Sequence, residues 1–408
     1  MRSVVLLVAC ILVGCAGRID GAGVDGAGVD GAGVDGAGVD GGPPDATPID
    51  PSDELYDPAV IPRLELELSQ ASVDALIAAP RVYVRGALHY GSEVVTDIGV
   101  RIKGEYNFRP LGEKAPFKLK FDEFVPGQTF HGLKRMTLNN ALEDPSWVAE
   151  RLTYAVYRHA GLAAPRANAA WVVVNGEDYG LYINVETEDK RFLGRWYADN
   201  GGNLYEEMQR DLVPGNEDFF ELETNEAAND RGDLTALFAA IDAANDSTLL
   251  ADIAGVIDTD AFLRYCAAEA AVWQWDGYCY TRWVPNNFRL YHEPTLDKFY
   301  FLPWGMDMSW KSHASGMDFF DPRGMLFERC LAGTTCRDAY RAELSATADR
   351  LEALDVVALA DAWGDQVRDS VAADPKKETT VSGFEDALAD VRAQAAERPT
   401  DIRAQLAQ

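Results

Sequence analysis

The sequence predicts an α+β fold in which a β-rich lobe precedes a mainly helical lobe, after a disordered N-terminal tether. Three observations predict this arrangement. Apolar and polar residues alternate with a period of two in several segments between residues 61 and 121. The pair Asn175-Gly176 joins two more strand-like segments, and this dipeptide is the strongest short hairpin signal. From residue 234 onward, apolar residues recur at the helical spacing of three and four.

The N-terminus reads as an export signal. Arg2 precedes an apolar run, residues 4–13, that is too short to span a bilayer. Leu12-Val-Gly-Cys15 follows and resembles the lipobox of bacterial lipoproteins, in which Cys15 is lipidated. We expect residues 1–15 to be a lipoprotein-type signal segment, which anchors the chain at the cell envelope or surface through Cys15. An ordinary secretory signal is the alternative, and the chain is then secreted.

Residues 16–53 are predicted to be a disordered linker. Four copies of Gly-Ala-Gly-Val-Asp fill residues 21–40, and they lack the apolar periodicity that a core requires. Calcium-binding repeats are the alternative, but they need a longer repeat with more acidic groups than the single Asp of this pentamer. The segment is therefore interpreted as a solvated spacer.

Charge and cysteine content narrow the possible partners. The formal net charge of −29 disfavours nucleic acid as a partner, because a polyanion is repelled. In an oxidising compartment, the four cysteines beyond the signal permit two disulfides, Cys266–Cys279 and Cys330–Cys336. A zinc site is disfavoured, because the chain has no Cys-x-x-Cys motif and only five histidines.

Residues 54–200 are predicted to form the β-rich lobe. Strands are expected at residues 61–68, 81–85 and 117–121. In the third, Phe117, Leu119 and Phe121 share one face, and Lys118 and Lys120 share the other. Such a sheet buries its apolar face and presents the two lysines to a cleft or to solvent.

One helix and one hairpin complete this lobe. Asp144 and Pro145 are typical of a helix cap and a first helical residue, so a helix is expected from there to His159. Strands at residues 169–175 and 179–186 follow it. The second of these strands ends on an acid, Glu186.

Residues 201–408 are predicted to form the helical lobe. Helices are expected at residues 234–244, 248–256 and 260–275, with three or four more between 338 and 408. A β-hairpin interrupts them, with a first strand after Asn286 and a returning strand at residues 298–302. This lobe also contains the polar residues Asp276, Asn287 and Asp307.

Three polar residues suggest chemistry. Asp276 follows the third helix, Asn287 begins the hairpin, and Asp307 lies just past its end. The outer ends of an antiparallel hairpin meet, so Asn287 and Asp307 are expected to face one cation. A carboxylate base followed by an amide and a second carboxylate that hold a metal is the arrangement that phosphoryl transfer from a nucleotide needs.

The chain resembles the CotH-type kinases, a family of secreted, atypical, protein-kinase-like enzymes named for a spore-coat protein. The resemblance extends from about residue 64 to residue 310. The segments that carry it include Arg101-Ile-Lys-Gly104, Lys114-Ala-Pro-Phe-Lys-Leu-Lys-Phe121, Leu138-Asn-Asn, Asp144-Pro-Ser146, Gly202-Asn-Leu-Tyr205, Trp275-Asp276, Asn287-Phe-Arg-Leu-Tyr291 and Pro303-Trp-Gly-Met-Asp307.

This resemblance implies a two-lobed protein-kinase-like fold and ATP-dependent phosphorylation of Ser or Thr on extracytoplasmic proteins, with Mg²⁺ or Mn²⁺. Lys118 is expected to contact the nucleotide phosphates and to form an ion pair with Glu186; Lys103 and Lys120 are the alternatives. The segment after Gly104 is expected to cover the phosphates. Asp276 is expected to be the base or a substrate-orienting acid, and Asn287 and Asp307 the metal ligands.

Two departures from the family pattern leave a second hypothesis open. The family usually has Trp-Asp-x-Asp at the metal end, and here Gly305 replaces the first acid. Glu105 adds a negative charge to the segment after Gly104, where the family has small polar residues. The alternative function is a catalytically inactive kinase-like scaffold that binds proteins or polymers of the cell envelope.

Overall fold

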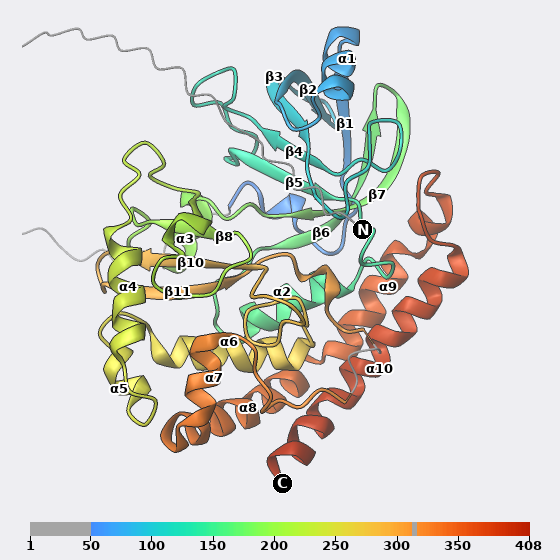
Figure 1. Cartoon of the computed structure of the whole chain (residues 1–408). Coiled ribbons are helices and arrows are strands. Elements are labelled where there is room, and N and C mark those ends of the chain that lie inside the picture. The colour runs from blue at the N-terminus through green and yellow to red at the C-terminus, as the bar shows by residue number, and fades with distance from the viewer. Residues whose placement is uncertain (1–49, 312–315) are drawn as a thin grey trace, which may run out of the picture. The chain divides into compact units, whose positions relative to one another are not determined.

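The computed structural model describes residues 50–311 and 316–408, which Figure 1 draws in colour. The predicted signal segment, Cys15 and most of the predicted linker lie outside these residues. The end of that linker, residues 50–53, lies within them. Ser52 is completely buried, and Asp53 begins a short 3-10 helix, Asp53–Leu55. These residues therefore belong to the folded part of the chain.

Seven strands form a closed barrel in the order β1-β2-β3-β4-β5-β7-β6. Its neighbouring strands are antiparallel, except that β1 and β6 run parallel where the barrel closes. Phe117 and Leu119 are buried in the barrel while Lys118 and Lys120 are partly exposed, as the alternation predicts. The strands are β1 (Arg63–Leu68), β2 (Val84–Tyr90), β3 (Glu93–Ile102), β4 (Phe117–Lys120), β5 (Arg135–Asn139), β6 (Ala167–Val174) and β7 (Glu177–Val185).

A second, four-stranded sheet has the order β11-β10-β8-β9, and its strands are antiparallel. They are β8 (Leu204–Glu207), β9 (Phe220–Leu222), β10 (Phe288–Glu293) and β11 (Lys298–Pro303). The predicted hairpin is confirmed as β10 and β11, with Phe288 opposite Pro303. Its outer ends do meet, since the Trp304 N–H donates to the Asn287 carbonyl at 3.2 Å.

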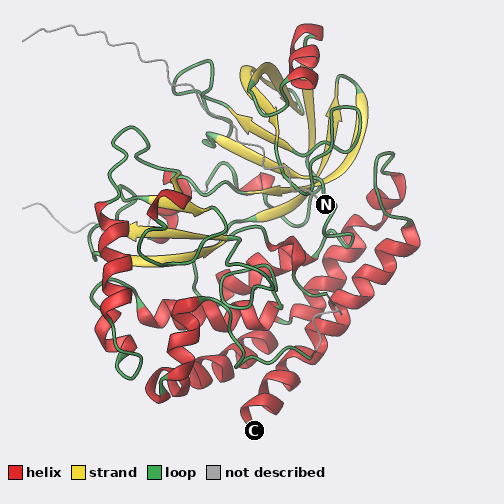
Figure 2. Cartoon of the chain, in the orientation of Figure 1, coloured by secondary structure: helices red, strands yellow, loops and turns green. Residues whose placement is uncertain are grey.

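Helices dominate the C-terminal part, as Figure 2 shows in red. The mixed α+β class is thus confirmed, with the helices expected between 234 and 275 and beyond 338. The helices are α1 (Gln70–Ala78), α2 (Ala149–His159), α3 (Lys190–Trp196), α4 (Gly232–Ala243), α5 (Leu249–Ile253), α6 (Thr259–Val272), α7 (Met325–Ala332), α8 (Thr334–Leu354), α9 (Val356–Ala373) and α10 (Val381–Leu406), with short 3-10 helices at Glu217–Phe219 and Met306–Met308.

The start of α2 differs from the prediction. The helix begins at Ala149 and not at Pro145. Trp147 has a left-handed backbone, φ 53°, which a continuous helix cannot contain. The N-cap residue is Val148 and not Asp144, but the Asp144 carboxylate accepts the N–H of Glu150 at 3.1 Å and so acts as a cap from outside the helix. The Ser146 hydroxyl accepts the N–H groups of residues 148 and 149.

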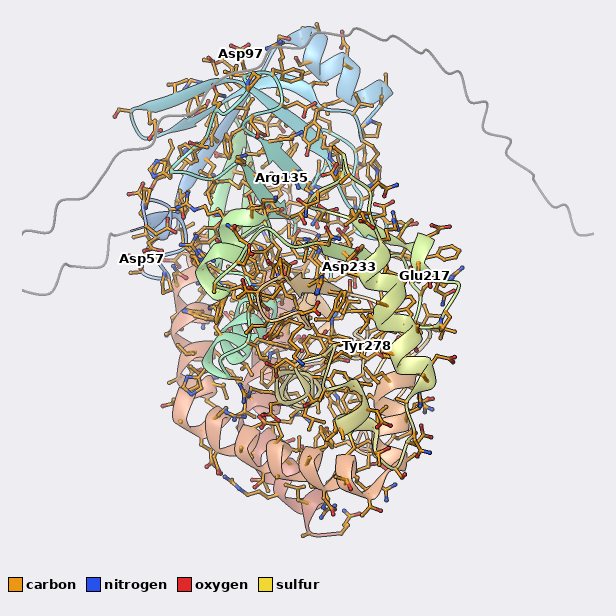
Figure 3. All side chains as sticks on the ribbon, turned by 90° about the vertical axis from the view of Figure 1, so that its left-hand side faces the viewer. Asp57, Asp97, Arg135, Glu217, Asp233 and Tyr278 are labelled. Carbon is orange, nitrogen blue, oxygen red and sulfur yellow. A yellow bond between two sulfur atoms is a disulfide. The ribbon has the colours of Figure 1, made fainter. Side chains whose placement is uncertain are left out.

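Two apolar clusters form most of the core. One fills the barrel, and the other extends through the helical part and the four-stranded sheet. Polar contacts join the barrel to the second sheet, for example from Arg135, labelled in Figure 3, to Glu223 at 3.4 Å. Within the described residues, no helix is both long enough and apolar enough to cross a membrane.

One of the two predicted disulfides is present. Cys330 and Cys336 are bonded, which closes the turn between α7 and α8. The prediction of a Cys266–Cys279 disulfide is wrong, because both residues are buried free thiols. The segment that carries Cys279 is held by Glu269 instead. This buried carboxylate accepts three consecutive backbone N–H groups, from Tyr278, Cys279 and Tyr280.

Candidate functional site

Lys103 joins the barrel to α2 through an amide. It directly follows β3, and its Nζ donates to Asn139 Oδ1 at 2.5 Å. The Nδ2 of Asn139 then donates to both carboxylate oxygens of Glu150, at 3.0 Å each. Asn139 is the last residue of β5 and Glu150 lies in the first turn of α2. The sequence predicted a direct ion pair between Lys118 and Glu186. The structure instead connects Lys103 to Glu150 through the Asn139 amide, and we call these three residues the Lys–Asn–Glu relay.

Asp307 lies beside this relay, in the 3-10 helix that follows β11. Burial raises the pKa of Asp307 to about 7, although the positive charges of Lys311 and Lys103 oppose the shift. Burial also raises the pKa of Glu150 to about 8, and the charge of Asp307 adds to that shift. Lys103, Glu150 and Asp307 thus form one electrostatic cluster, in which a further cation would favour the ionised carboxylates.

The 3-10 helix is held in place by Trp310. The indole Nε1 donates to the Thr153 hydroxyl of α2 at 2.9 Å, and the Trp310 backbone N–H donates to the Val272 carbonyl of α6 at 2.9 Å. Both contacts are buried. They fix Asp307 relative to the helix that carries Glu150.

Asp276 orients Asn287. The Asn287 Nδ2 donates to the Asp276 carboxylate at 2.7 Å and to its backbone carbonyl at 2.9 Å. The other amide atom, Oδ1, is turned toward Gly305, where a Cβ atom would lie only 2.4 Å away. Oδ1 therefore lies beside the segment that leads to Asp307.

Lys118 belongs to the same charged region, together with Arg289. Burial lowers the pKa of Lys118 to about 8, while the charge of Glu223 opposes this shift and that of Arg289 adds to it. Arg289 is buried and forms ion pairs with Glu188 at 3.1 Å and with Glu206 at 2.6 Å. Lys103 also responds to the charges of Arg289 and Glu206, so the two lysines share one electrostatic environment.

Trp304 contacts two cations. The guanidinium of Arg289 is 4.3 Å from the centre of its ring, and Lys103 Nζ is 5.7 Å from it. Both distances are typical of cation–π contacts, which help to fix the orientation of the ring. The indole thereby links the Lys103 relay to the Arg289 pairs.

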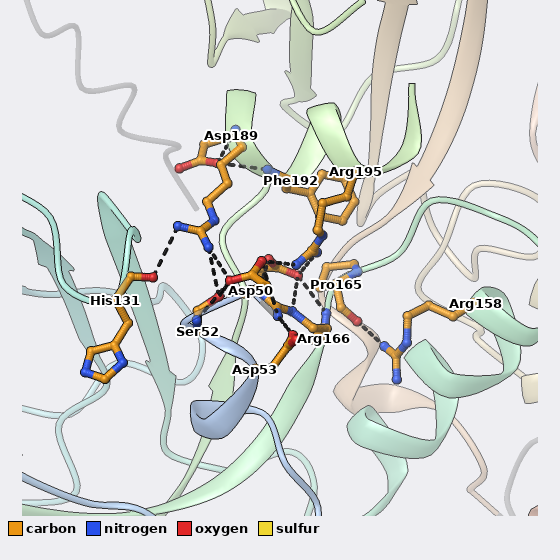
Figure 4. A network of polar contacts seen from close by, with 12 residues as sticks. Asp50, Ser52, Asp53, His131, Arg158, Pro165, Arg166, Asp189, Phe192 and Arg195 are labelled. Carbon is orange, nitrogen blue, oxygen red and sulfur yellow. Dashed lines mark hydrogen bonds and ion pairs between the residues drawn. The ribbon is translucent and has the colours of Figure 1, made fainter. Parts of the chain in front are cut away.

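The predicted ion pair between Lys118 and Glu186 is not formed. Glu186 pairs with Arg166 at 2.8 Å and with Arg195. Figure 4 shows both arginines in a network that also includes Asp50 and Ser52 of the N-terminal segment. Glu186 is 1% exposed, and the two guanidinium groups satisfy its charge. Glu186, which directly follows β7, therefore has a structural role in these ion pairs.

The two remaining predicted residues have local roles in the structure. Lys120 pairs with Glu123 at 2.7 Å, so the structure does not bring it into the cluster. Gly104 has a left-handed backbone, φ 83°, and a Cβ there would lie 2.0 Å from Asn107 Oδ1. Glycine is thus required for the turn that follows Lys103.

Sequence reasoning missed four residues of the site: Asn139, Glu150, Arg289 and Trp304. Asn139, Arg289 and Trp304 lie in segments quoted for the family resemblance, but they carried no assigned role. Glu150 had a detectable signal, since it is an acid in the first turn of a helix whose following residues are mostly apolar. Pairing through an intervening amide has no fixed spacing in sequence, so it was not predictable.

The residues present fit a single divalent cation. Mg²⁺ and Mn²⁺ bind carboxylate and amide oxygens, and Asp307 and Asn287 Oδ1 supply one of each. Among residues 50–311 and 316–408, there is no group of three or more His, Cys, Asp or Glu side chains that could hold a metal ion. Asp307 and Asn287 would therefore be a partial ligand set, of the kind that is common where Mg²⁺ binds together with nucleotide phosphates.

Comparisons with known proteins agree with the sequence resemblance. The family model described as CotH kinase protein matches residues 100–403. The chain belongs to this family. The match includes Lys103, Glu150, Asp276 and Asp307, as well as helices α7 to α9 and most of α10.

Curated relatives of this CotH family chain are distant. It is 24% identical over 280 residues to the inner spore coat protein H of Bacillus subtilis, covering 64% of this chain and 75% of that protein. It is 28% identical over 274 residues to the invasin CotH2 of Rhizopus delemar, covering 62% of this chain and 45% of that protein. A spore coat protein and an invasin suggest a coat or surface location for the family.

Proposed function

We propose that this chain is an ATP-dependent protein Ser/Thr kinase that acts outside the cytosol, with Mg²⁺ or Mn²⁺. The observation that carries the proposal is the grouping of the Lys103–Asn139–Glu150 relay with Asp307, beside an Asn287 oriented by Asp276. These are the parts that phosphoryl transfer needs: a cation for the phosphates, ligands for a metal and a carboxylate near an acceptor hydroxyl.

Each side chain has a role in this proposal. Lys103 and Lys118 bind phosphate oxygens, and Glu150 orients Lys103 through Asn139. Asn287 Oδ1 and Asp307 hold the metal ion, which supplies charge neutralisation on the phosphate oxygens. The loop after Gly104 covers the nucleotide.

In this proposal, Asp276 accepts the proton of the substrate hydroxyl. Its Oδ2 is engaged by Asn286 and Asn287, which leaves Oδ1 for a substrate hydroxyl. Burial raises the pKa of Asp276, which makes it a better proton acceptor than an exposed carboxylate. As the hydroxyl proton moves to Asp276, the hydroxyl oxygen bonds to the γ-phosphorus. The bond from that phosphorus to the β,γ-bridging oxygen breaks, and ADP leaves.

An extracytoplasmic site of action is supported by the N-terminal segment that resembles a lipoprotein signal. The names of the relatives, a spore coat protein and an invasin, point in the same direction. The proposed partners are therefore a nucleotide and an extracytoplasmic protein, with a membrane contact only through lipid on Cys15.

The test is label transfer from γ-labelled ATP with Mn²⁺, with the protein alone and with casein. We expect transfer by the wild type, its loss in Asp307→Asn and in Lys103→Met, and no change in Lys120→Met. Lys120 is a matched control because it lies on the same barrel and, among the charged groups of the described residues, forms an ion pair only with Glu123. Equal transfer by wild type and Asp307→Asn would refute the assignment of Asp307.

A second candidate is the inactive envelope scaffold. Gly305 favours it, because Asp307 is then the only carboxylate of that motif. This candidate predicts neither label transfer nor binding of a fluorescent ATP analogue by the wild type. Nucleotide binding that is lost in Asp307→Asn would argue against it.

A further inference from the structure

The loop of residues 104–116 begins directly after Lys103, a residue of the candidate site. It leaves the barrel after Lys103 and returns at β4, and the Lys103 N–H donates to the Pro116 carbonyl at 2.9 Å. The two ends of the loop are thereby tied together at the residue whose side chain begins the relay. The conformation of the loop therefore sets the backbone position of Lys103.

A turn from the far end of the chain holds this loop. We call residues 374–380, which join α9 to α10, the strap. Its contacts reach the loop at three points. Asp374 forms a buried ion pair with Lys114, Glu378 binds Arg109 through two hydrogen bonds of 2.5 and 2.7 Å, and Lys376 Nζ donates to the Gly112 carbonyl at 2.7 Å.

Asp374 is fitted closely into the barrel. Besides Lys114, its carboxylate accepts the Leu181 N–H of β7 at 2.8 Å and the Lys376 N–H at 2.9 Å. A Cβ on Gly180 would lie 1.9 Å from Asp374 Oδ1, so the fit requires glycine there. A buried ion pair adds little net stability, but its geometry is restrictive. Asp374 therefore fixes the position of the strap against the barrel, and it contributes little to the free energy of unfolding.

A cavity lies between the strap and the segment before α2. The cavity is about 160 Å³ and is lined by Glu378 and Thr379 of the strap and by Leu142, Pro145 and Trp147 opposite. Asn140, which adjoins Asn139 of the relay, also donates to the loop carbonyls of residues 107 and 114. The strap and the relay segment thus hold the loop from two sides.

We infer that the strap is a positioning element for the nucleotide site, in which Asp374 and Glu378 hold the 104–116 loop in the conformation that presents Lys103 to Asn139. This inference rests on the proposed function where it names a nucleotide site; that the strap holds the loop is tested without nucleotide. Asp374 and Glu378 are positioning residues, since neither contacts the Lys103 relay.

The first test is hydrogen exchange of the loop in the whole protein without nucleotide. We expect faster exchange in residues 104–116 of Glu378→Gln and Asp374→Asn, because contacts that order the loop are lost. The charge swap Arg109→Glu with Glu378→Arg should restore slow exchange. Glu352→Gln is the control, since Glu352 makes a similar double contact with Arg403 between α8 and α10, remote from the loop. Unchanged loop exchange in folded Glu378→Gln and Asp374→Asn would overturn the inference.

The second test is the KM for ATP. We expect Glu378→Gln to raise it roughly two- to fivefold, the size expected for loss of one partly exposed ion pair, with kcat nearly unchanged. Rescue of KM by the charge swap distinguishes positioning from a general loss of stability. Faster loop exchange with an unchanged KM would overturn the link to the nucleotide site. If the wild type transfers no phosphate, the proposed function fails, and the exchange data alone decide whether the strap holds the loop.

Discussion

Lys103 and Lys118 are two positive side chains of one charged region, but different groups hold them. Lys103 is fixed by Asn139 and faces Asp307, whereas Lys118 faces Glu223 and Arg289. Burial lowers the pKa of both lysines, and that of Lys118 to about 8. The positive charge of Lys118, which we propose binds phosphate, therefore depends on pH near pH 8.

This dependence predicts weaker nucleotide binding at high pH. A lysine with a lowered pKa is protonated below about pH 8 and loses its charge above it, so the attraction for phosphate falls as pH rises. We expect the dissociation constant of a fluorescent ATP analogue to rise between pH 7.5 and 9.5, by at most about tenfold per pH unit. Lys118→Arg, which stays charged, should flatten the curve. Identical curves for both proteins would assign the phosphate contact to Lys103.

Gly305 cannot be converted into the missing acid without damage. Its backbone is left-handed, φ 61°, and its Cβ position is 2.4 Å from Asn287 Oδ1. We expect Gly305→Asp to lose about 2 kcal/mol or more in the free energy of unfolding, from backbone strain and from displacement of Asn287. It should also weaken Mn²⁺ binding, despite the added carboxylate.

A matched control separates strain from displacement. Gly176 is also left-handed, φ 80°, with no atom within 4 Å of its Cβ position. Gly176→Asp should therefore cost only the strain, about 1–2 kcal/mol, and leave Mn²⁺ binding intact. Chemical denaturation and Mn²⁺ titration measure both quantities. Tighter Mn²⁺ binding by Gly305→Asp would show that Asn287 is not a ligand.

At the scale of elements, α2 is the part that brings the barrel and the helical part together at the site. It carries Glu150 in its first turn and receives Trp310 at Thr153. Its N-terminus is built by Asp144 and Ser146, with the left-handed Trp147 between them and the helix. The position of Glu150 therefore depends on this cap.

Removal of the Asp144 carboxylate should lower both the free energy of unfolding and the affinity of the site for nucleotide. Asp144→Ala leaves the Glu150 N–H without its acceptor, and we expect a loss of about 1–2 kcal/mol in unfolding free energy and weaker nucleotide binding. Ser69→Ala is the control, since Ser69 caps α1 by accepting the Ser72 N–H at 3.1 Å. It should cost a similar amount of stability and leave nucleotide binding unchanged. If both variants bind nucleotide equally well, the cap does not position Glu150.

At the scale of the whole chain, the periodicity of apolar residues predicted the secondary structure well but did not predict which charged side chains form ion pairs. The alternation at residues 117–121, the Asn175-Gly176 hairpin and the C-terminal helices follow from local pattern, and the structure confirms them. The hairpin also correctly predicts that the segments around Asn287 and Trp304 meet. The pairing of Glu186 with Arg166 follows from the Asn175-Gly176 hairpin, because Arg166 directly precedes Ala167, which lies opposite Val185. The contact of Lys103 with Glu150 through Asn139 joins segments far apart in the sequence, which no local pattern encodes.

The excess of acidic groups makes the whole protein sensitive to cations in two separable ways. A net charge of −29 implies self-repulsion that salt screens, so Tm should rise with NaCl. A divalent ion bound at Asn287 and Asp307 adds a specific stabilisation that grows with its concentration. We therefore expect MnCl₂ to raise Tm further than NaCl at equal ionic strength, and Asp307→Asn to lose only this additional shift. Because the substitution also removes a carboxylate from the cluster, its Tm in NaCl alone is the reference. An additional Mn²⁺ shift of equal size in Asp307→Asn would place the ion elsewhere on the acidic surface.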